Sequence, residues 1–287
     1  MREDLRELWR FRELLWAMVE RELRIRYKNS FLGFFWSLLN PLLTVSVMWL
    51  VFRVFLHNGT PNFTPYVLSA YLPFMFVNLA VMDSAQSVIT SLPVVKKVYF
   101  PREILPLASV LANFFHFVLA MGVFFAFLFV VWATTGFKDT PFTWRIGFLP
   151  VLLVITLALT TGLSLMISAL NVFYEDVKYV VGVLLYLTFF LTPIMYFSEN
   201  VYFSLKEKGL VQLYYLYHLN PIATLATAYK KALVPPGQID AGGGIGLIPA
   251  FPMHWGLFAV ATIVSIAVLF AGYGLFNRLK WRFVERP

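Results

Sequence analysis

Residues 96–134 read KKVYFPREILPLASVLANFFHFVLAMGVFFAFLFVVWAT, and this stretch decides the fold class. It opens with a charged segment in which Pro101 favours a turn, and from Ile104 onward it contains no Asp, Glu, Lys or Arg. An uncharged apolar run of this length exceeds the roughly 20 residues that a helix needs to cross a bilayer. The stretch therefore predicts a membrane-spanning helix over 104–134, long enough to tilt, preceded by a polar loop over 90–103.

The whole chain has the composition of a membrane protein. Of its 287 residues, 60% are hydrophobic and 13% are charged, whereas soluble domains are about 45–50% apolar and about 25% charged. Basic cytoplasmic loops account for the net charge of +8. We expect no nucleic-acid partner, because no soluble segment combines a basic patch with aromatics. The absence of cysteine excludes disulfides and thiolate metal sites.

Similar apolar segments recur along the chain and predict an all-α protein with six transmembrane helices. They form one transmembrane domain over 31–280, which a tail over 281–287 follows. The fifth segment is short and ends in LTPIMY, where Pro193 should break the helix. We expect the six spans at 34–56, 65–89, 104–134, 145–169, 179–197 and 253–276.

Residues 1–30 form a cytoplasmic segment that is rich in charge. Within 5–28, leucines and tryptophans share one helical face, while arginines and glutamates occupy another. This pattern is typical of an amphipathic helix that lies in the membrane interface. A helix packed on protein has the same pattern, and this alternative stays open.

The distribution of basic residues predicts the orientation. If the N-terminus is inside, 16 Lys and Arg residues fall in inside segments and 6 fall in outside segments. An excess of Lys and Arg marks cytoplasmic loops, so we expect both termini in the cytoplasm. The loops 90–103 and 170–178 are then cytoplasmic, and the loop 198–252 is extracellular.

The long outer segment 198–252 is apolar in part. Residues 211–217 and 222–233 have helical spacing of apolar side chains, which predicts short helices that dip into the outer leaflet or cap the bundle. The following residues 235–249, PPGQIDAGGGIGLIP, predict a flexible loop.

The sequence contains no motif for catalysis, nucleotide binding or a metal site, so we expect neither an enzyme nor a cofactor in this chain. Ionisable residues inside spans are the default functional candidates in a membrane protein. Asp83 is the most interesting of them, and structural pairing and pathway lining explain it equally well. Arg53 can extend to the interface, and His116 suits a hydrogen bond between helices.

Aromatic side chains crowd the fifth span and the outer segment. Such residues are typical of lipid-facing belts. The alternative is a lining on which the apolar faces of sugar rings stack. Candidates for that lining are Trp36, Tyr186, Phe190, Tyr196, Phe197 and Tyr215.

Several segments resemble the ABC-2 type permeases that export O-antigen, capsular polysaccharide and teichoic acid. The resemblance covers nearly the whole chain, and its most specific part is the Phe-Pro-Arg-Glu element at 100–103. The segments are YKNSFLGFFWSLLNPLL (27–43), VKKVYFPREILPLASVLANF (95–114), LNVFYEDVKYVV (170–181), LTPIMYFSENV (191–201) and LNPIATLATAYKKAL (219–233).

The resemblance implies a multi-pass protein of the bacterial inner (plasma) membrane, in which two copies form one channel. Two separate ATPase subunits, which bind ATP and Mg, would dock on its cytoplasmic loops and drive a lipid-linked polysaccharide outward. Arg24, Arg26 and Lys28 would meet the pyrophosphate of that substrate, although anionic membrane lipids explain them equally well. The coupling residues would be Lys97, Val98, Tyr99, Phe100, Pro101, Arg102, Glu103, Glu175 and Asp176.

Two other interpretations stay open at this point. One is an ABC-2 permease for another amphiphilic cargo, such as a drug or a lipid, although the long aromatic outer segment favours a glycan. The other is an ion-coupled carrier, which would need a second intramembrane acid or an inverted repeat.

Overall fold

The structure is a computed structural model of the chain. It describes residues 2–27, 39, 42–44, 46–47, 50–55, 63–134, 144–234, 238–240 and 247–284. Of the first predicted span, 34–56, the structure describes only short separate pieces and the π-helix η1 Leu50–Phe55. Trp36, Lys28 and the side chains of Arg26 and Arg53 also lie outside the described part of the chain.

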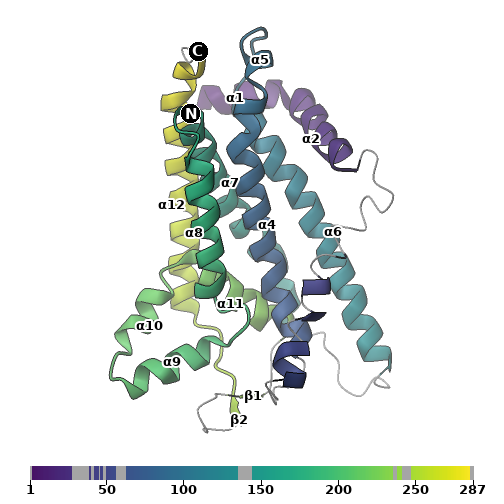
Figure 1. The fold of residues 1–287 in the computed structure, drawn as a ribbon, viewed down its shortest axis with the longest axis vertical. Helices are drawn as coiled ribbons and strands as arrows, with labels where there is room; N and C mark the ends of the chain where they lie inside the picture. Colours follow the sequence, from purple (N-terminus) through teal and green to yellow (C-terminus); the bar gives the residue numbers. More distant parts are fainter. Residues whose placement is uncertain are drawn as a thin grey trace.

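Four long helices build the bundle in Figure 1: α4 Phe63–Thr90, α6 Ile104–Thr134, α7 Leu149–Phe173 and α12 Trp255–Leu279. The 3₁₀ turns η2 Trp144–Phe148 and η3 Lys280–Val284 extend α7 and α12. Among the described residues, these four are long and apolar enough to cross a membrane. The chain is therefore a multi-pass, almost entirely helical protein, and four of the six predicted spans are present as such.

The fifth predicted span is the shorter apolar helix α8, Val177–Leu191. It ends because Thr192 precedes a proline and adopts an extended conformation, with φ −91° and ψ 138°. The expected break at Pro193 is confirmed. Within the described structure Leu185 is the only residue of α8 that is buried, so this helix lies on the outside of the single chain.

The N-terminal segment forms two helices, α1 Arg2–Arg10 and α2 Arg12–Tyr27, where one was predicted. They follow each other closely, because Phe11 still donates its backbone N–H to Glu7 at 3.1 Å. Val19 of α2 packs against Ala108 and Ala112 of α6, while Trp9 and Trp16 stay exposed. The segment therefore contacts the bundle with one face, and the two large side chains of Trp9 and Trp16 remain exposed on the surface of the chain.

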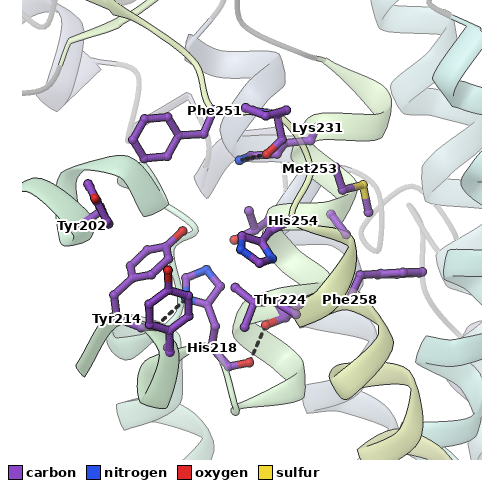
Figure 2. A pocket seen from close by; sticks show the side chains of 14 residues that line it. Tyr202, Tyr214, His218, Thr224, Lys231, Phe251, Met253, His254 and Phe258 are labelled. Carbon is purple, nitrogen blue, oxygen red and sulfur yellow. Dashed lines mark hydrogen bonds between the residues drawn. The ribbon is translucent and has the colours of Figure 1, made fainter. Parts of the chain in front are cut away.

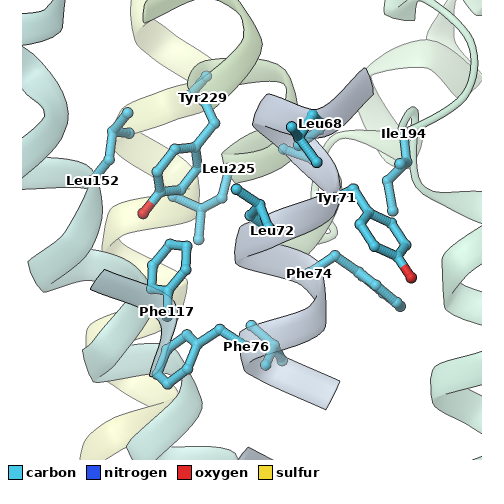
Figure 3. Close-up of a cluster of buried hydrophobic side chains, with 14 of the residues drawn as sticks. Leu68, Tyr71, Leu72, Phe74, Phe76, Phe117, Leu152, Ile194, Leu225 and Tyr229 are labelled. Carbon is cyan, nitrogen blue, oxygen red and sulfur yellow. The ribbon is translucent and has the colours of Figure 1, made fainter. Parts of the chain in front are cut away.

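Backbone-to-backbone packing joins α7 to α12. A Cβ atom placed on Gly272 would lie 2.1 Å from the carbonyl oxygen of Gly162. Small residues allow membrane helices to approach this closely. Elsewhere the core is built from large side chains, such as Phe76 stacked on Phe117 at 5.1 Å between α4 and α6 (Figure 3).

In the described residues of the segment 198–252, the chain forms three helices and a small hairpin: α9 Ser198–Glu207, α10 Gln212–Tyr217, α11 Pro221–Leu233, and strands β1 Gln238–Asp240 and β2 Leu247–Pro249. The two predicted short helices are confirmed as α10 and α11. Since α11 buries most of its residues and contacts α4, α7 and α12, it caps the bundle.

Part of the outer segment differs from the prediction. The expected flexible loop 235–249 contains the antiparallel pair β1–β2, in which Ile239 lies opposite Ile248. The two strands lie on either side of a glycine-rich stretch of sequence. Strands of only three residues are too short to show the alternation of apolar and polar residues that predicts a strand. Helix α9 was not predicted either.

Candidate functional site

The predicted coupling segment, residues 97–103, lies at one end of the bundle, beside both chain termini (Figure 1). It follows the short helix α5, Leu92–Val95, and leads into α6. Val98 and Tyr99 are 58% and 73% exposed, whereas Phe100 is buried in a cluster with Phe276 and Phe283 of the C-terminal region. The segment therefore offers two large side chains to a partner and anchors itself through the third.

Arg102 and Glu103 have partners within the chain. Glu103 Oε1 lies 2.6 Å from Lys280 Nζ, and these side chains are only 1% and 10% exposed. Arg102 donates to the Lys280 carbonyl, and its guanidinium lies over the Phe283 ring. Burial lowers the pKa of Arg102 from its usual value. These contacts attach the coupling segment to the end of α12 and occupy two of the side chains that were predicted as coupling residues.

The N-terminal helix reaches the same place. Tyr99 donates a hydrogen bond to Glu7 Oε1 at 3.0 Å, and this bond to a carboxylate raises the pKa of the Tyr99 hydroxyl. A depression of about 250 Å³ lies between Glu7, the coupling segment, Lys280 and Trp281. Three parts of the chain that are distant in sequence thus form one surface.

The second predicted contact, Glu175 and Asp176, is exposed in the turn between α7 and α8. Asn171 holds this turn in place. Its Nδ2 donates to the Ala85 carbonyl of α4 at 2.8 Å, and its Oδ1 accepts from the Lys178 N–H at 3.0 Å. The turn is therefore fixed to α4, the long helix that precedes α5 and the coupling segment.

Two of the predicted headgroup and intramembrane residues, Arg24 and Asp83, have side-chain partners within the chain. Arg24 is exposed on α2 and pairs with Glu20 one turn earlier, at 2.5 Å. Asp83 lies partly buried on α4 and accepts a hydrogen bond from Asn113 Nδ2 of α6 at 2.8 Å. This bond supports the structural-pairing interpretation of Asp83.

Four of the predicted lining residues occupy three different environments. Tyr186 and Phe190 are exposed on α8 and contact each other at 5.2 Å. Tyr196 is half-buried and shares a hydrogen bond of 3.1 Å with the Tyr217 hydroxyl. Phe197 is 1% exposed and stacks on Tyr66 at 4.4 Å. This differs from the lining role predicted for Phe197, because both the ring and its stacking partner lie in the interior of the chain.

Tyr215 belongs to a pocket of about 230 Å³ at the other end of the bundle. Figure 2 shows aromatic and imidazole side chains from α9, α10, α12 and the preceding loop turned toward one space. The wall consists of Tyr202, Tyr214, Tyr215, His218, Thr224, Thr227, Ala228, Lys231, Phe251, Pro252, Met253, His254, Leu257 and Phe258.

A buried charge cluster supports the wall of this pocket. Glu199 of α9 is 1% exposed and pairs with Lys231 of α11 at 3.2 Å. Glu199 also accepts from the Phe251 N–H and the Ser198 hydroxyl, each at 3.0 Å. The cluster thus connects α9, α11 and the residues that follow β2. The charge and the hydrogen-bonding oxygens of the buried Glu199 carboxylate have partners there.

Lys230 is buried beside this cluster. Its Nζ donates to the carbonyls of Pro193 and Tyr196, at 2.5 and 3.0 Å, and lies 4.2 Å from the centre of the Tyr66 ring. Burial lowers the pKa of Lys230.

Sequence reasoning missed Glu199, Lys230 and Lys231 as buried groups. It counted both lysines as ordinary outer charges, although two lysines inside the apolar helix 222–233 were the available signal. Glu199 lies 32 residues before its partner Lys231 in the sequence, so the pairing depends on how α9 folds back on α11.

Comparison with known proteins identifies the family. The profile of the ABC-2 type transporter family matches residues 13–233. The O-antigen export system permease protein RfbA of Myxococcus xanthus is 30% identical over 98% of both chains. A protein of the same name from Klebsiella pneumoniae is 27% identical over 95% of this chain and 94% of its own length. The polysialic acid transport protein KpsM of Escherichia coli is 21% identical over 83% of this chain and 87% of its own. The chain therefore belongs to the ABC-2 type transporter family.

Proposed function

We propose that this chain is the permease subunit of an ATP-driven exporter that moves a lipid-linked polysaccharide out of the cytoplasm. The observation that carries the proposal is the similarity to an O-antigen export permease, which covers 98% of that protein's length. Relatives named for O-antigen export and polysialic acid transport favour a glycan over a drug or another lipid.

The proposed placement is the bacterial inner membrane, with both termini in the cytoplasm. Two observations support this orientation. The basic coupling segment, the turn at Glu175 and both termini lie at the same end of the bundle (Figure 1). The Lys and Arg excess of the sequence falls in these same segments.

The proposed assembly contains two copies of this chain and two ATPase subunits, which bind the ATP and Mg. Helix α8 supports the idea of a second copy, because its exposed face carries Tyr186, Leu187, Phe190 and Leu191. A large apolar face on one side of a helix needs lipid or protein against it. In this assembly Tyr186 and Phe190 would line the path of the glycan, and their rings would stack on its sugars.

The exposed pair Val98 and Tyr99 would contact the ATPase. The depression beside them provides a surface of mixed charge into which part of a partner subunit fits. Because Glu103 and Lys280 join this surface to α12, ATP-driven movement of the partner would pass into α12 and its close neighbour α7.

Cysteine cross-linking tests the proposal, since the chain has no cysteine of its own. Val98→Cys and Tyr99→Cys should cross-link to a co-expressed ATPase subunit, because both side chains are exposed. Phe100→Cys is the matched control beside them: its side chain is buried, and it should react much less. Leu213→Cys is exposed at the opposite end and should not reach the ATPase.

The proposal fails if no ATPase co-purifies with the chain and neither Val98→Cys nor Tyr99→Cys forms a cross-link. It also fails if Leu213→Cys cross-links in their place. In cells, loss of the chain should leave the finished glycan inside the cytoplasm, which extraction of the lipid-linked material measures.

A further inference from the structure

We infer that the pocket between α9, α10, α11 and the start of α12 binds one neutral pyranose unit of the exported glycan. The inference rests on the proposed function and assigns a substrate contact at the outer end of the single chain. Three features of the pocket support this assignment: its shape, one buried imidazole and the balance of charge around it.

Aromatic rings dominate the shape of the pocket (Figure 2). Tyr202 contacts both Tyr214 and Phe251 with ring centroids 5.4 Å apart. The volume of about 230 Å³ suits a single sugar ring rather than a longer chain. A pyranose has one apolar face of C–H groups, which stacks on aromatic rings, and a rim of hydroxyls that needs hydrogen-bond partners.

His218 supplies an unused acceptor inside this pocket. The side chain is 2% exposed, and its Nδ1 lies 3.2 Å from the Tyr214 carbonyl. A carbonyl only accepts, so Nδ1 carries the proton and Nε2 is left as an acceptor. Among the described residues, Nε2 has no hydrogen-bond partner. A hydroxyl of the ligand satisfies this buried atom, and buried polar atoms rarely stay without a partner.

The imidazole is neutral at pH 7. Burial lowers the pKa of His218 to about 4. The Thr224 hydroxyl, which donates to the His218 carbonyl at 2.7 Å, fixes the backbone at this point. The ring is therefore a rigid neutral acceptor, which suits a hydroxyl group.

The charge in the wall is compensated. Lys231 is the basic side chain of the wall, and Glu199 neutralises it at 3.2 Å. Its Nζ also lies 3.3 Å from the Pro252 carbonyl. Because Glu199 already neutralises Lys231, a phosphate or carboxylate in the pocket would add a buried negative charge without a cation of its own, which is costly. This balance favours a neutral sugar over an acidic or phosphorylated one.

The place of the pocket fits this use. It lies at the end of the bundle that carries α9, α10 and the β-hairpin, opposite the coupling segment (Figure 1). In the proposed orientation this end faces outward. The pocket would hold a sugar unit after it has crossed the membrane and so oppose its return.

Saturation-transfer NMR tests the inference on the complete transporter with its ATPase. The complex is placed in nanodiscs of phosphatidylethanolamine and phosphatidylglycerol, because alkyl-glycoside detergents carry sugar headgroups themselves. The probes are the methyl glycosides of glucose, galactose, mannose, rhamnose and N-acetylglucosamine. Methyl glucuronide, glucose 6-phosphate and octanol are the acidic, phosphorylated and apolar comparisons. At least one neutral glycoside should bind saturably and more tightly than all three.

Two variants of the pocket give the second half of the test. His218→Phe removes the acceptor, and Thr227→Phe fills the space from α11 without touching the charge cluster; each should weaken binding at least tenfold. His218→Gln keeps an acceptor and should stay within about threefold of the unmodified chain. Phe129→Ala removes an exposed ring on α6 outside the pocket and should have no effect.

Four outcomes would overturn the inference: no binding by any neutral glycoside, equal binding in both Phe variants, preference for an acidic or phosphorylated sugar, or binding of octanol alone. Size-exclusion elution of each variant shows whether it has folded. Export that continues without sugar binding refutes the pocket and leaves the proposed function standing, whereas absence of ATPase cross-linking refutes the proposed function itself.

Discussion

At the residue scale, the ion pair Glu103–Lys280 anchors the coupling segment to the region that follows α12. The Phe-Pro-Arg-Glu element was expected to face a partner subunit, and half of it instead holds the C-terminal end of the chain. The exposed side chains are those of Val98 and Tyr99, which come just before this element. Local sequence indicated the turn, but the partner Lys280 is 177 residues away and could not be read from it.

Removing one member of this pair should destabilise the protein. Lys280→Met leaves Glu103 as a buried carboxylate without its cation, which costs on the order of 3 kcal/mol. The double variant Glu103→Gln/Lys280→Met should recover much of this loss, because no charge stays buried. Thermal unfolding of the purified complex measures both, and a double variant that is less stable than Lys280→Met would contradict the explanation.

His218 should make the stability of the protein depend on pH. Its pKa falls from the usual 6.5 to about 4 in the folded chain, because burial disfavours the charged ring. The corresponding stability is therefore fully present above pH 6.5 and is lost as the pH falls toward 4. From this difference, the loss at pH 5 is on the order of 2 kcal/mol.

The measurement is the unfolding temperature at pH 7 and pH 5, compared between the unmodified chain and His218→Gln. Subtracting the variant removes the contribution of carboxylates that titrate in the same range. The unmodified chain should lose more stability than the variant, and equal losses would show that His218 does not titrate as its burial requires.

At the element scale, the contact of α7 with α12 rests on the absence of two side chains. Gly272→Ala would bring a Cβ atom to 2.1 Å from the Gly162 carbonyl oxygen, so the helices must move apart. Overpacking of this kind costs about 1–3 kcal/mol. Gly274→Ala on the same helix is the control, because nothing lies within 4 Å of its Cβ position.

The two variants should differ in the yield and unfolding temperature of the purified protein. Gly274→Ala should match the unmodified chain or exceed it slightly, since alanine favours a helix more than glycine does. A Gly272→Ala variant as stable as Gly274→Ala would mean that α7 and α12 do not approach each other closely.

The elements differed in how well the sequence predicted them. Long apolar runs fix α4, α6, α7 and α12 because a bilayer-length helix is a strong signal. Pro221 and Asn220 mark the start of α11, where the Asn220 side chain accepts from the Ile222 N–H at 3.0 Å. The break at Phe11, helix α9 and the β-hairpin depend on contacts with distant segments, so local patterns did not reveal them.

At the scale of the whole molecule, the chain has two chemically different ends. One end joins both termini, the coupling segment and the turn at Glu175, and it is rich in basic and exposed groups. The other end joins α9, α10, α11 and the hairpin around buried charges and an aromatic pocket. Sequence reasoning predicted which segments share an end, because every span reverses the direction of the chain. It did not predict that the outer end contains a pocket, since four separate segments form the wall.

The orientation of these ends is open to a direct test. The side chains of Lys97 and Lys206 are both exposed, and the segments that contain them lie at opposite ends of the bundle. Each can be replaced singly, as Lys97→Cys and Lys206→Cys. A membrane-impermeant maleimide added to intact cells whose outer membrane, if present, has been removed should label Lys206→Cys and leave Lys97→Cys unlabelled. Lysis of the cells before labelling is the control and should make both positions equally reactive. The reverse pattern would place the termini outside, and the ATPase could then not reach Val98 and Tyr99. Labelling of both positions in intact cells would instead show that the bundle does not separate its two ends across a membrane.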